Sequence, residues 1–547
     1  MKKQNIIWAA LLLLAMPAFS QNAAVQKAAK AVFTLKTFNH GQSLMTCQGV
    51  FIDNKGTALT AFTPFDGADS AVVVDAFGKT RAVDYIMGAD ENYDVAKLKI
   101  EGSSTGVALA SSVSGGCTLW LVSASTGKTA SQKLTVDHVE PFDNHYSYAI
   151  TKYVVGDADL AAPVVNGGGQ LVGLIKGLPS GTESGITDGR FVNSLHMDAL
   201  SIQKLSHTGI RTGLPDDENA AEATLMLARS TRSKADNYKY AREFIEKFPT
   251  SATGYQALAE LDCNAGKFAD ADKELQLGVT KAAKKDEAYS NYAQQVYQYV
   301  AFTPQGGYTP WTADKALELA QKANSIAPNP AYQHQIAQVT YLKGDYQKAY
   351  DSFQALTKTN INNGELWYES AQCKMQLKAP ESEVKALLDS AVSVGQQKGI
   401  VAPYYLVRGQ WLQSKEDYRN ALKDYIAYDT LSTRVDPTFY HAKYECEMKL
   451  HQWQPALLDI MRCSYLSPRE PLYLAQWASL ELLVNRLPQA IQVATACTKA
   501  APDFAQGYLI LGIAQCENKQ KEEGLRNLQK AKELGETRAG EYLKKFQ

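Results

Sequence analysis

The strongest constraint on the fold of this 547-residue chain is a recurrence of small residues in its second half. Ala421, Ala456 and Ala490 stand 35 and 34 residues apart, each with a large side chain three residues earlier. A period near 34 residues is typical of stacked helical hairpins. The small residue lets two helix axes approach closely, and the large residues fill the space between neighbouring hairpins. Because one hairpin cannot bury its apolar stripe alone, several hairpins must stack.

The same register extends over residues 218–547. One unit matches the pattern of small and large positions at Tyr255, Leu258, Ala259, Gly266, Phe268, Ala271 and Leu275. This pattern resembles the tetratricopeptide repeat (TPR), a helix-turn-helix family. The resemblance implies an all-α superhelix of about nine hairpins with a polar capping helix at 537–546.

The TPR resemblance also implies a peptide-binding groove, built mainly from the first helix of each hairpin. Carrying over the groove positions of the family selects Gln256, Glu260, His334, Gln338, Tyr341, Tyr368, Gln372, Gln410, Gln413, His441 and Glu445. Amide and tyrosine side chains are suited to hydrogen bonding with an extended peptide backbone. The alternative for each residue is a solvated helix face. The basic clamp with which some relatives hold a C-terminal carboxylate is absent from these positions, so we predict a protein or peptide bound through backbone and apolar contacts.

The first half of the chain, residues 24–206, has a different pattern. Short runs rich in Val, Ile, Thr and Leu alternate with Gly, Asp and Asn turns, at 32–35, 49–52, 71–74, 95–100, 118–122 and 171–175. Many short strands at this spacing predict an all-β barrel or sandwich. Residues 207–217 have neither helical nor strand periodicity and are predicted to be the linker between the two parts.

Three segments of this half resemble the trypsin-like serine proteases, most closely the bacterial heat-shock-protease branch. Residues 49–60 (GVFIDNKGTALT) resemble the two strands that lead to the catalytic histidine of the family, and residues 94–100 (DVAKLKI) resemble its aspartate strand. Residues 156–166 (GDADLAAPVVN), followed by Gly173, resemble its nucleophile loop. The resemblance implies a double β-barrel over most of residues 30–200.

The residues that carry the chemistry of that family are replaced. On this alignment the histidine position falls on Thr63 and the serine position on Leu160, whereas the aspartate is kept as Asp94. Acyl transfer in this family needs a hydroxyl nucleophile and an imidazole that takes its proton. Leucine has no hydroxyl, and a threonine with an unperturbed hydroxyl cannot act as a base near neutral pH. No catalytic residue is therefore expected.

The surroundings of the lost nucleophile change in the same direction. Glycines that hold the backbone donors of the oxyanion hole in the family are replaced by Ala158, Ala161 and Ala162, which restrict the backbone more. Asp94 is then either a relic of the triad or a carboxylate that accepts hydrogen bonds from backbone N–H groups. The hypothesis is a degenerate protease domain, retained as a folded binding or assembly module.

The N-terminus has the layout of a cleaved secretory signal. Lys2 and Lys3 precede an apolar run, and small residues at Ala18 and Ser20 suit cleavage after Ser20. A membrane anchor is the alternative, but the run is short for a bilayer span. We expect residues 1–20 to be removed, no other membrane segment, and export to the bacterial periplasm or cell envelope, with secretion from the cell as the alternative.

Charge and residue spacing exclude several other classes of protein. Fifty-six Lys and Arg against 57 Asp and Glu argue against a general nucleic-acid binder. The eight cysteines and eight histidines are scattered without ligand spacing, so neither a metal nor another cofactor is predicted. The cysteines are interpreted as small apolar core residues.

The sequence thus favours an exported, non-catalytic adaptor or scaffold, with a protease-like domain and a TPR groove for protein or peptide partners. One alternative is an active envelope serine endopeptidase that recruits substrates through its repeats. Another is a component of an outer-membrane assembly. The identity of the partner and the oligomeric state are left open.

Overall fold

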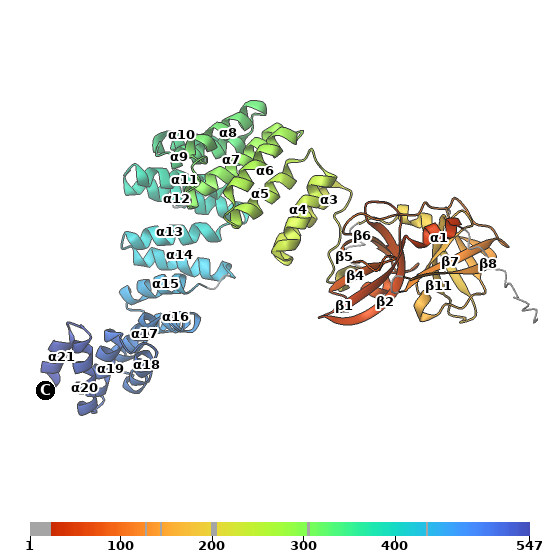
Figure 1. Ribbon diagram of the computed structural model, residues 1–547. Helices are drawn as coiled ribbons and strands as arrows, with labels where there is room; N and C mark the ends of the chain where they lie inside the picture. The colour runs from red at the N-terminus through yellow and green to blue at the C-terminus, as the bar shows by residue number, and fades with distance from the viewer. Residues whose placement is uncertain (1–22, 126–127, 143–144, 198–204, 304–306, 434–435) are drawn as a thin grey trace, which may run out of the picture. The chain divides into compact units, whose positions relative to one another are not determined.

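The structure is a computed structural model that describes residues 23–125, 128–142, 145–197, 205–303, 307–433 and 436–547. The predicted signal peptide, residues 1–20, lies outside this part of the chain. The chain forms two compact units, Met1–Asn291 and Tyr292–Gln547. All strands belong to the first unit, and helices occur in both (Figure 1).

The first unit contains two closed, six-stranded antiparallel barrels, the trypsin-like double barrel that the sequence predicts (Figure 1). Strand order is β1-β2-β3-β6-β5-β4 in the first barrel and β10-β11-β12-β9-β8-β7 in the second. The strands are β1 (Val32–Asn39), β2 (Gln42–Phe51), β3 (Thr57–Thr60), β4 (Ser70–Asp75), β5 (Thr80–Asp90), β6 (Val95–Ile100), β7 (Thr118–Ser125), β8 (Lys128–Phe142), β9 (Tyr146–Thr151), β10 (Pro163–Val165), β11 (Leu171–Gly177) and β12 (Ser184–Asp188). A short helix, α1 (Ala23–Ala29), packs against β7 and β8.

The strands form in short runs that are rich in β-branched and other apolar residues. In β4, Ala71 and Val73 are buried whereas Ser70 is exposed, which is the period-two pattern of a half-buried strand. All six runs identified from the sequence lie within strands or overlap them, so the all-β prediction for this half is confirmed. Four short 3-10 helices join or follow the strands: η1 (Thr63–Phe65), η2 (Asp157–Asp159), η3 (Gly189–Asn193) and η4 (Leu205–His207).

Nineteen α-helices follow the barrels in the described residues, and the all-α prediction for the second half is confirmed (Figure 1). They are α3 (Glu218–Thr231), α4 (Lys234–Lys247), α5 (Ala252–Asn264), α6 (Phe268–Lys281), α7 (Lys285–Phe302), α8 (Ala313–Ile326), α9 (Pro330–Leu342), α10 (Tyr346–Leu356), α11 (Gly364–Gln376), α12 (Glu381–Lys398), α13 (Ala402–Ser414), α14 (Tyr418–Leu431), α15 (Pro437–Lys449), α16 (Trp453–Leu466), α17 (Pro471–Leu483), α18 (Leu487–Ala500), α19 (Ala505–Glu517), α20 (Lys521–Glu533) and α21 (Ala539–Phe546). The boundary between the two units falls within α7.

Consecutive helices pack in pairs, such as α13 with α14, α15 with α16 and α17 with α18. Ala421, Ala456 and Ala490, the small residues that set the period, are 0% exposed on the second helix of these three pairs. Their burial agrees with the expectation that they allow close approach of helix axes. Among the helices that the structure describes, none is both long and apolar enough to cross a membrane.

Residues 207–217 are mostly buried, although they form neither an α-helix nor a strand ladder. Thr212 makes a parallel bridge to Ile86 of β5, and Leu214 is 1% exposed. The segment ends where Asp217 caps α3 by accepting a hydrogen bond from the Ala220 N–H. The backbone between barrel and helices is therefore fixed on the first barrel.

Arg211 is the centre of this attachment within the first unit. Its guanidinium lies over the rings of Tyr85 of β5 and Tyr240 of α4, at 4.3 and 5.0 Å from their centroids. It pairs with Glu243 of α4, and with Asp84 of β5 at 3.3 Å. Arginine suits such a position because it stacks on aromatic rings and pairs with carboxylates at the same time. The first barrel and α4 are thereby joined by a buried charge.

The electrostatics of this charge follow from burial and pairing. Burial lowers the pKa of Arg211, but the charges of Glu243 and Asp84 outweigh it, so its pKa is raised. Burial raises the pKa of Glu243 despite Arg211 and the hydrogen bond from the Leu214 N–H. Removing one partner would leave the other charged and buried, which is costly. The contact thus holds the helices to the barrel.

Candidate functional site

The region that resembles a protease active site contains Asp94, directly before β6. Its backbone has φ of +52°, a left-handed conformation that aspartate tolerates better than most residues. The carboxylate Oδ1 accepts hydrogen bonds from the N–H groups of Phe62 and Thr63 at 3.0 and 2.7 Å. Of the two interpretations of Asp94, the carboxylate bonded by backbone N–H groups agrees with this geometry.

Thr63 occupies the position that the resemblance assigns to the imidazole. It is the first residue of η1, and its hydroxyl donates to Asp94 Oδ1 at 2.8 Å. The ammonium of Lys176, on β11, lies 3.9 Å from Asp94 Oδ2. Asp94 therefore interacts with a hydroxyl, two amides and an ammonium group, and the Thr63 proton is directed to Asp94.

Leu160 follows η2, in the loop that resembles the nucleophile loop. Its carbonyl accepts a hydrogen bond from the Gln48 N–H at 2.8 Å, and the Gln48 amide donates to the Ala158 carbonyl at 3.3 Å. The next residue, Ala161, has φ of +57°, the region that favours glycine. The loop is thus held against β2, with a left-handed backbone at Ala161.

The Leu160 side chain packs against the apolar core that the two barrels share. The cavity that it borders measures about 10 Å³, room for one water molecule at most. The lining residues are Ala61, Tyr93, Asp94, Val95, Leu160, Ala161, Leu174, Ile175, Lys176 and Thr187. Serine, cysteine and histidine do not occur among them.

Two other polar groups lie near this region, and sequence reasoning did not select either. The thiol of Cys47 is 2% exposed and lies 3.2 Å from the Thr60 hydroxyl. Burial raises the pKa of Cys47 to about 11, so the group is a thiol and not a nucleophilic thiolate near neutral pH. His207 lines a larger cavity of about 470 Å³ together with Thr63 and Glu91.

The predicted groove residues lie on the first helices of their hairpins. In the first unit, Gln256 donates to Glu260 within α5 at 3.0 Å, and Glu260 also pairs with Arg229 of α3. The remaining nine belong to the second unit, on α9, α11, α13 and α15.

Several of the nine bind the first helix of the next hairpin. The bonds are His334 Nε2 to Glu369 Oε2 (2.5 Å), Gln338 Nε2 to Glu369 Oε1 (2.8 Å), Gln413 Nε2 to Glu445 Oε2 (2.9 Å) and His441 Nε2 to Gln476 Oε1 (2.8 Å). These side chains are engaged in contacts between repeats, and a ligand would have to compete with those contacts.

The other four, Tyr341, Tyr368, Gln372 and Gln410, border one cavity of about 330 Å³ between α9, α11 and α13. This volume lies within the range of ligand pockets in proteins. Four further lining residues were not selected from the sequence: Met375, Gln376, Val407 and Trp411. Most of these lie one helical turn, three or four residues, from a predicted position, and that spacing could have identified them.

None of the eight side chains that line this cavity is ionised at neutral pH. Burial raises the pKa of Tyr341 and of Tyr368, although hydrogen bonds from Gln376 and Gln372 lower it. Both phenols are therefore neutral. The cavity offers aromatic faces, amides and hydroxyls, which suit an uncharged ligand.

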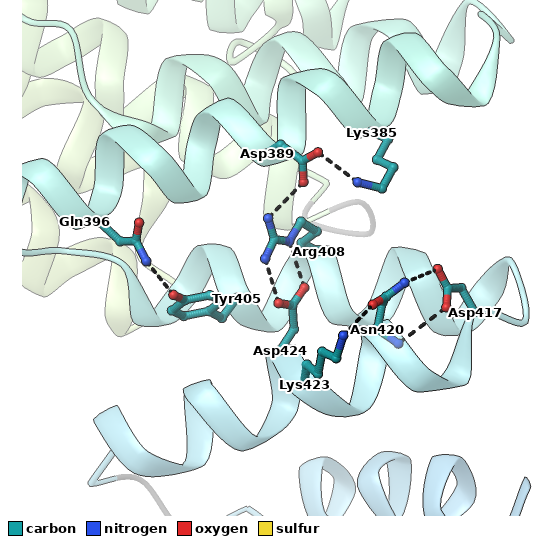
Figure 2. A network of polar contacts seen from close by, with 9 residues as sticks. All are labelled: Lys385, Asp389, Gln396, Tyr405, Arg408, Asp417, Asn420, Lys423 and Asp424. Atoms are coloured by element: carbon teal, nitrogen blue, oxygen red, sulfur yellow. Dashed lines mark hydrogen bonds and ion pairs between the residues drawn. The ribbon is translucent and has the colours of Figure 1, made fainter. Parts of the chain in front are cut away.

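The orientation of α13 at the cavity is set by Arg408 (Figure 2). Its guanidinium binds both oxygens of Asp424 on α14, at 2.8 and 2.7 Å, and reaches Asp389 of α12 at 2.8 Å. Tyr405 of the same helix accepts a hydrogen bond from Gln396 of α12 at 2.6 Å. These bonds connect three consecutive helices, so the side chains of α13 that face the cavity have a defined direction.

Close packing adds to this positioning. A Cβ on Gly364 of α11 or Gly395 of α12 would lie 2.3 or 2.6 Å from the Tyr404 ring, so glycine is required where this ring of α13 is inserted. Trp411 packs against the apolar clusters on both sides of α13. The cavity wall is therefore built from side chains that other contacts hold in place.

Comparisons with known proteins give a distant structural likeness. No family model matches the sequence, and no curated protein matches it. Among solved structures, the chain is similar to an HtrA-type protease, AlgW, with a tripeptide, at a TM-score of 0.28 and 20% identity. A variant of that protease with a tripeptide gives a TM-score of 0.28 and 19% identity. Each match covers 31% of this chain and 60% of the protease chain, less than two thirds of its length.

Proposed function

We propose that this protein is an exported, non-catalytic adaptor, in which a degenerate protease domain is joined to TPR repeats that bind a protein or peptide segment. The observation that carries the proposal is the side chain of Leu160, packed into the shared core of the barrels at the position of the family's nucleophile. An aliphatic side chain there cannot form an acyl intermediate. Thr63 supports the same conclusion, because its hydroxyl is bonded to Asp94.

The binding role is assigned to the second unit because four of the predicted groove residues border its cavity of about 330 Å³, whereas none of them borders the cavity of about 470 Å³ at Thr63. The paired helices with a period near 34 residues support the TPR interpretation. Aromatic and amide side chains at the cavity can bond a peptide backbone and pack on its side chains. Export is proposed from the N-terminal residues alone, as an address for the mature chain.

The absence of catalysis is tested with the purified full chain. We expect no hydrolysis of casein and no covalent labelling by a fluorophosphonate reagent. The matched control is Leu160→Ser combined with Thr63→His, which introduces the serine hydroxyl and the imidazole at the two aligned positions. It tests whether the backbone of this domain supports catalysis once these two groups are present. If the reagent labels the unaltered chain, and the labelling disappears when one of its own serines is replaced by alanine, the endopeptidase alternative is established instead.

The binding role is tested by cross-linking in cells. A photoreactive benzoylphenylalanine at position 372, in the cavity, is compared with one at the exposed position 398 at the end of α12. We expect a discrete cross-linked partner from position 372 that position 398 does not give, with the cross-link mapped by mass spectrometry to one segment of the partner. Identical products from both positions would argue against the groove.

A further inference from the structure

The side chains that line the cavity between α9, α11 and α13 indicate which class of peptide segment it binds. This inference rests on the proposed binding role. We propose that the cavity binds a proline-rich segment in the polyproline II conformation, entering with its carbonyl groups toward the tyrosine hydroxyls and its rings against Tyr341, Tyr368 and Trp411.

The first argument is the direction of the hydrogen bonds. Gln372 Nε2 donates to the Tyr368 hydroxyl oxygen at 3.0 Å, both residues lining the cavity. A phenol that accepts a bond in this way still has its own proton to donate. Tyr341 lines the same cavity beside Gln376, and as a neutral phenol it also carries a proton that it can donate. Two hydroxyl donors are thus present on neighbouring walls of the cavity.

The second argument is the ligand that such donors require. A polyproline II helix has no internal hydrogen bonds, so its carbonyl groups are available as acceptors. Proline has no N–H, so a run of prolines presents acceptors without donors. An ordinary extended peptide also brings one N–H for each carbonyl, and these N–H groups would have to share the amide oxygens of Gln372, Gln376 and Gln410.

The third argument is charge. None of the eight lining residues is acidic or basic. The basic residues beside the lining positions on these helices are already paired, Lys374 with Glu383 and Arg408 with Asp424 and Asp389. A charged tail or a free carboxylate would lose its hydration without gaining a partner. An uncharged proline-rich segment has no such cost.

The fourth argument is shape. Three aromatic residues border the cavity, and aromatic-lined grooves are the recurrent solution for polyproline II recognition because the ligand is preformed and loses little entropy. The volume of 330 Å³ accommodates roughly one turn, about three residues, of such a helix. Trp411 is held by the clusters on both sides of α13, so the receiving surface is preformed as well.

The test is a binding titration of the full chain with a fluorescent polyproline peptide of about ten residues, blocked at both ends so that it carries no terminal charge. We expect saturable binding by fluorescence anisotropy. The matched probes are a blocked glycine-serine peptide of equal length, an acidic peptide with a free C-terminus, and maltohexaose. We expect these three to bind at least about tenfold more weakly.

Tyr341→Phe with Tyr368→Phe removes the two donors and keeps both rings. We expect this variant to bind polyproline about tenfold more weakly, the effect of two lost hydrogen bonds. Gln410→Glu is a second, isosteric variant that places negative charge near the ligand carbonyls, and it should also weaken binding. The control is Tyr465→Phe on α16, an 85% exposed side chain outside the cavity lining, which should bind within about twofold of the unaltered chain.

The outcomes separate this inference from the proposed function. Polyproline binding that the tyrosine and Gln410 variants leave unchanged, or a preference for maltohexaose, overturns the inference. If position 372 cross-links a partner at a segment without proline, the inference fails and the adaptor role stands. If neither a peptide nor a cross-linked partner is found, both fail.

Discussion

The region around Thr63, Asp94 and Leu160, here called the cleft, and the cavity of the second unit differ in what their polar groups contact. In the cleft, the Asp94 carboxylate is bonded to Thr63 and to backbone N–H groups, and Leu160 leaves a space of about 10 Å³. In the cavity, Tyr341 and Tyr368 border a space of about 330 Å³. The Asp94 carboxylate and the Leu160 side chain are thus engaged by their neighbours, whereas the cavity of the second unit leaves room for a ligand. Substitutions should therefore affect stability in the cleft and binding in the cavity.

The largest effect is expected for Asp94→Ala. The change removes the acceptor of three hydrogen bonds from a side chain that is 9% exposed, and it places alanine in the left-handed region. We expect the free energy of unfolding of the first barrel to fall by about 3 kcal/mol, since two backbone N–H groups and a hydroxyl lose a charged acceptor and alanine is strained in this conformation. The measurement is the urea dependence of labelling at Cys47, a buried thiol of β2 that reacts once the barrel opens.

Asp94→Asn is the matched control, because asparagine tolerates the same backbone conformation and keeps one acceptor oxygen. It should lose about half as much stability. Labelling at Cys373, which is 0% exposed on α11 of the other unit, should stay unchanged in both variants. An Asp94→Ala chain whose Cys47 labelling follows the unaltered curve would contradict the structural role given to this carboxylate.

A smaller effect is expected for Leu160→Ala. Leucine-to-alanine changes cost about 2 to 5 kcal/mol when the side chain is fully buried. Leu160 is half-buried, so we expect about 1.5 kcal/mol by Cys47 labelling. Leu44→Ala on β2 is the control, because Leu44 is 46% exposed and should change stability by less than about 0.5 kcal/mol. Equal effects of the two substitutions would mean that Leu160 is not packed as described.

The sequence predicts the two architectures well because each has a local signature. Short runs rich in Val, Ile, Thr and Leu between turn residues predict the strands, and Ala421, Ala456 and Ala490 fix the period of the hairpins. Residues 207–217 show the limit of this reasoning. Arg211 of this segment is buried, and its partners Asp84, Tyr85 and Glu243 are distant in the sequence. No local pattern encodes such a contact.

The candidate site shows the same limit. Thr63, Asp94 and Leu160 could be selected from a family resemblance, and the structure places Thr63 beside Asp94. The groove positions were selected by register, which does not distinguish His334, bonded to the next repeat, from Tyr341, at the cavity. That distinction depends on the spacing of neighbouring helices, and a repeat pattern does not contain it.

We expect the interaction between His334 and Glu369 to contribute about 1 kcal/mol to the free energy of unfolding. Burial lowers the pKa of His334, but the hydrogen bond to Glu369 and the charges of Glu369 and Glu365 outweigh it, so its pKa is raised. Because the pKa of His334 is higher in the folded chain, its protonated form stabilises the folded state. This stabilisation is complete at pH values below the pKa of histidine in the unfolded chain, about 6.5, and is lost as the pH rises through the pKa in the folded chain. Burial, with the charge of Glu369, raises the pKa of Glu365, which gives the same sign at lower pH.

We therefore expect the urea midpoint of helix unfolding, followed by circular dichroism at 222 nm, to fall between pH 6 and pH 8. His334→Gln should flatten this slope. Glu369→Gln should do the same, and the double variant should add little because both changes remove one interaction. A slope that persists in all three variants would assign the pH dependence to other groups.

The smallest change in stability is expected for Tyr341→Phe combined with Tyr368→Phe, although it has the largest expected effect on binding at the cavity. Each substitution keeps the ring and removes a hydroxyl of a residue that borders the cavity, where the Tyr368 hydroxyl accepts a hydrogen bond from Gln372 Nε2 at 3.0 Å. We expect the free energy of unfolding, measured by the urea dependence of Cys373 labelling, to change by less than about 0.5 kcal/mol, since groups at an open cavity can be solvated in the unfolded and folded chain alike. Tyr425→Phe is the matched comparison, because the Tyr425 hydroxyl donates to Gln413 at 2.6 Å and the ring is 0% exposed. That single change should lower the free energy of unfolding, measured by circular dichroism in urea, by about 1 kcal/mol. If the cavity tyrosines cost as much as Tyr425, their hydroxyls serve the fold, and the contrast between a filled cleft and an open cavity does not hold.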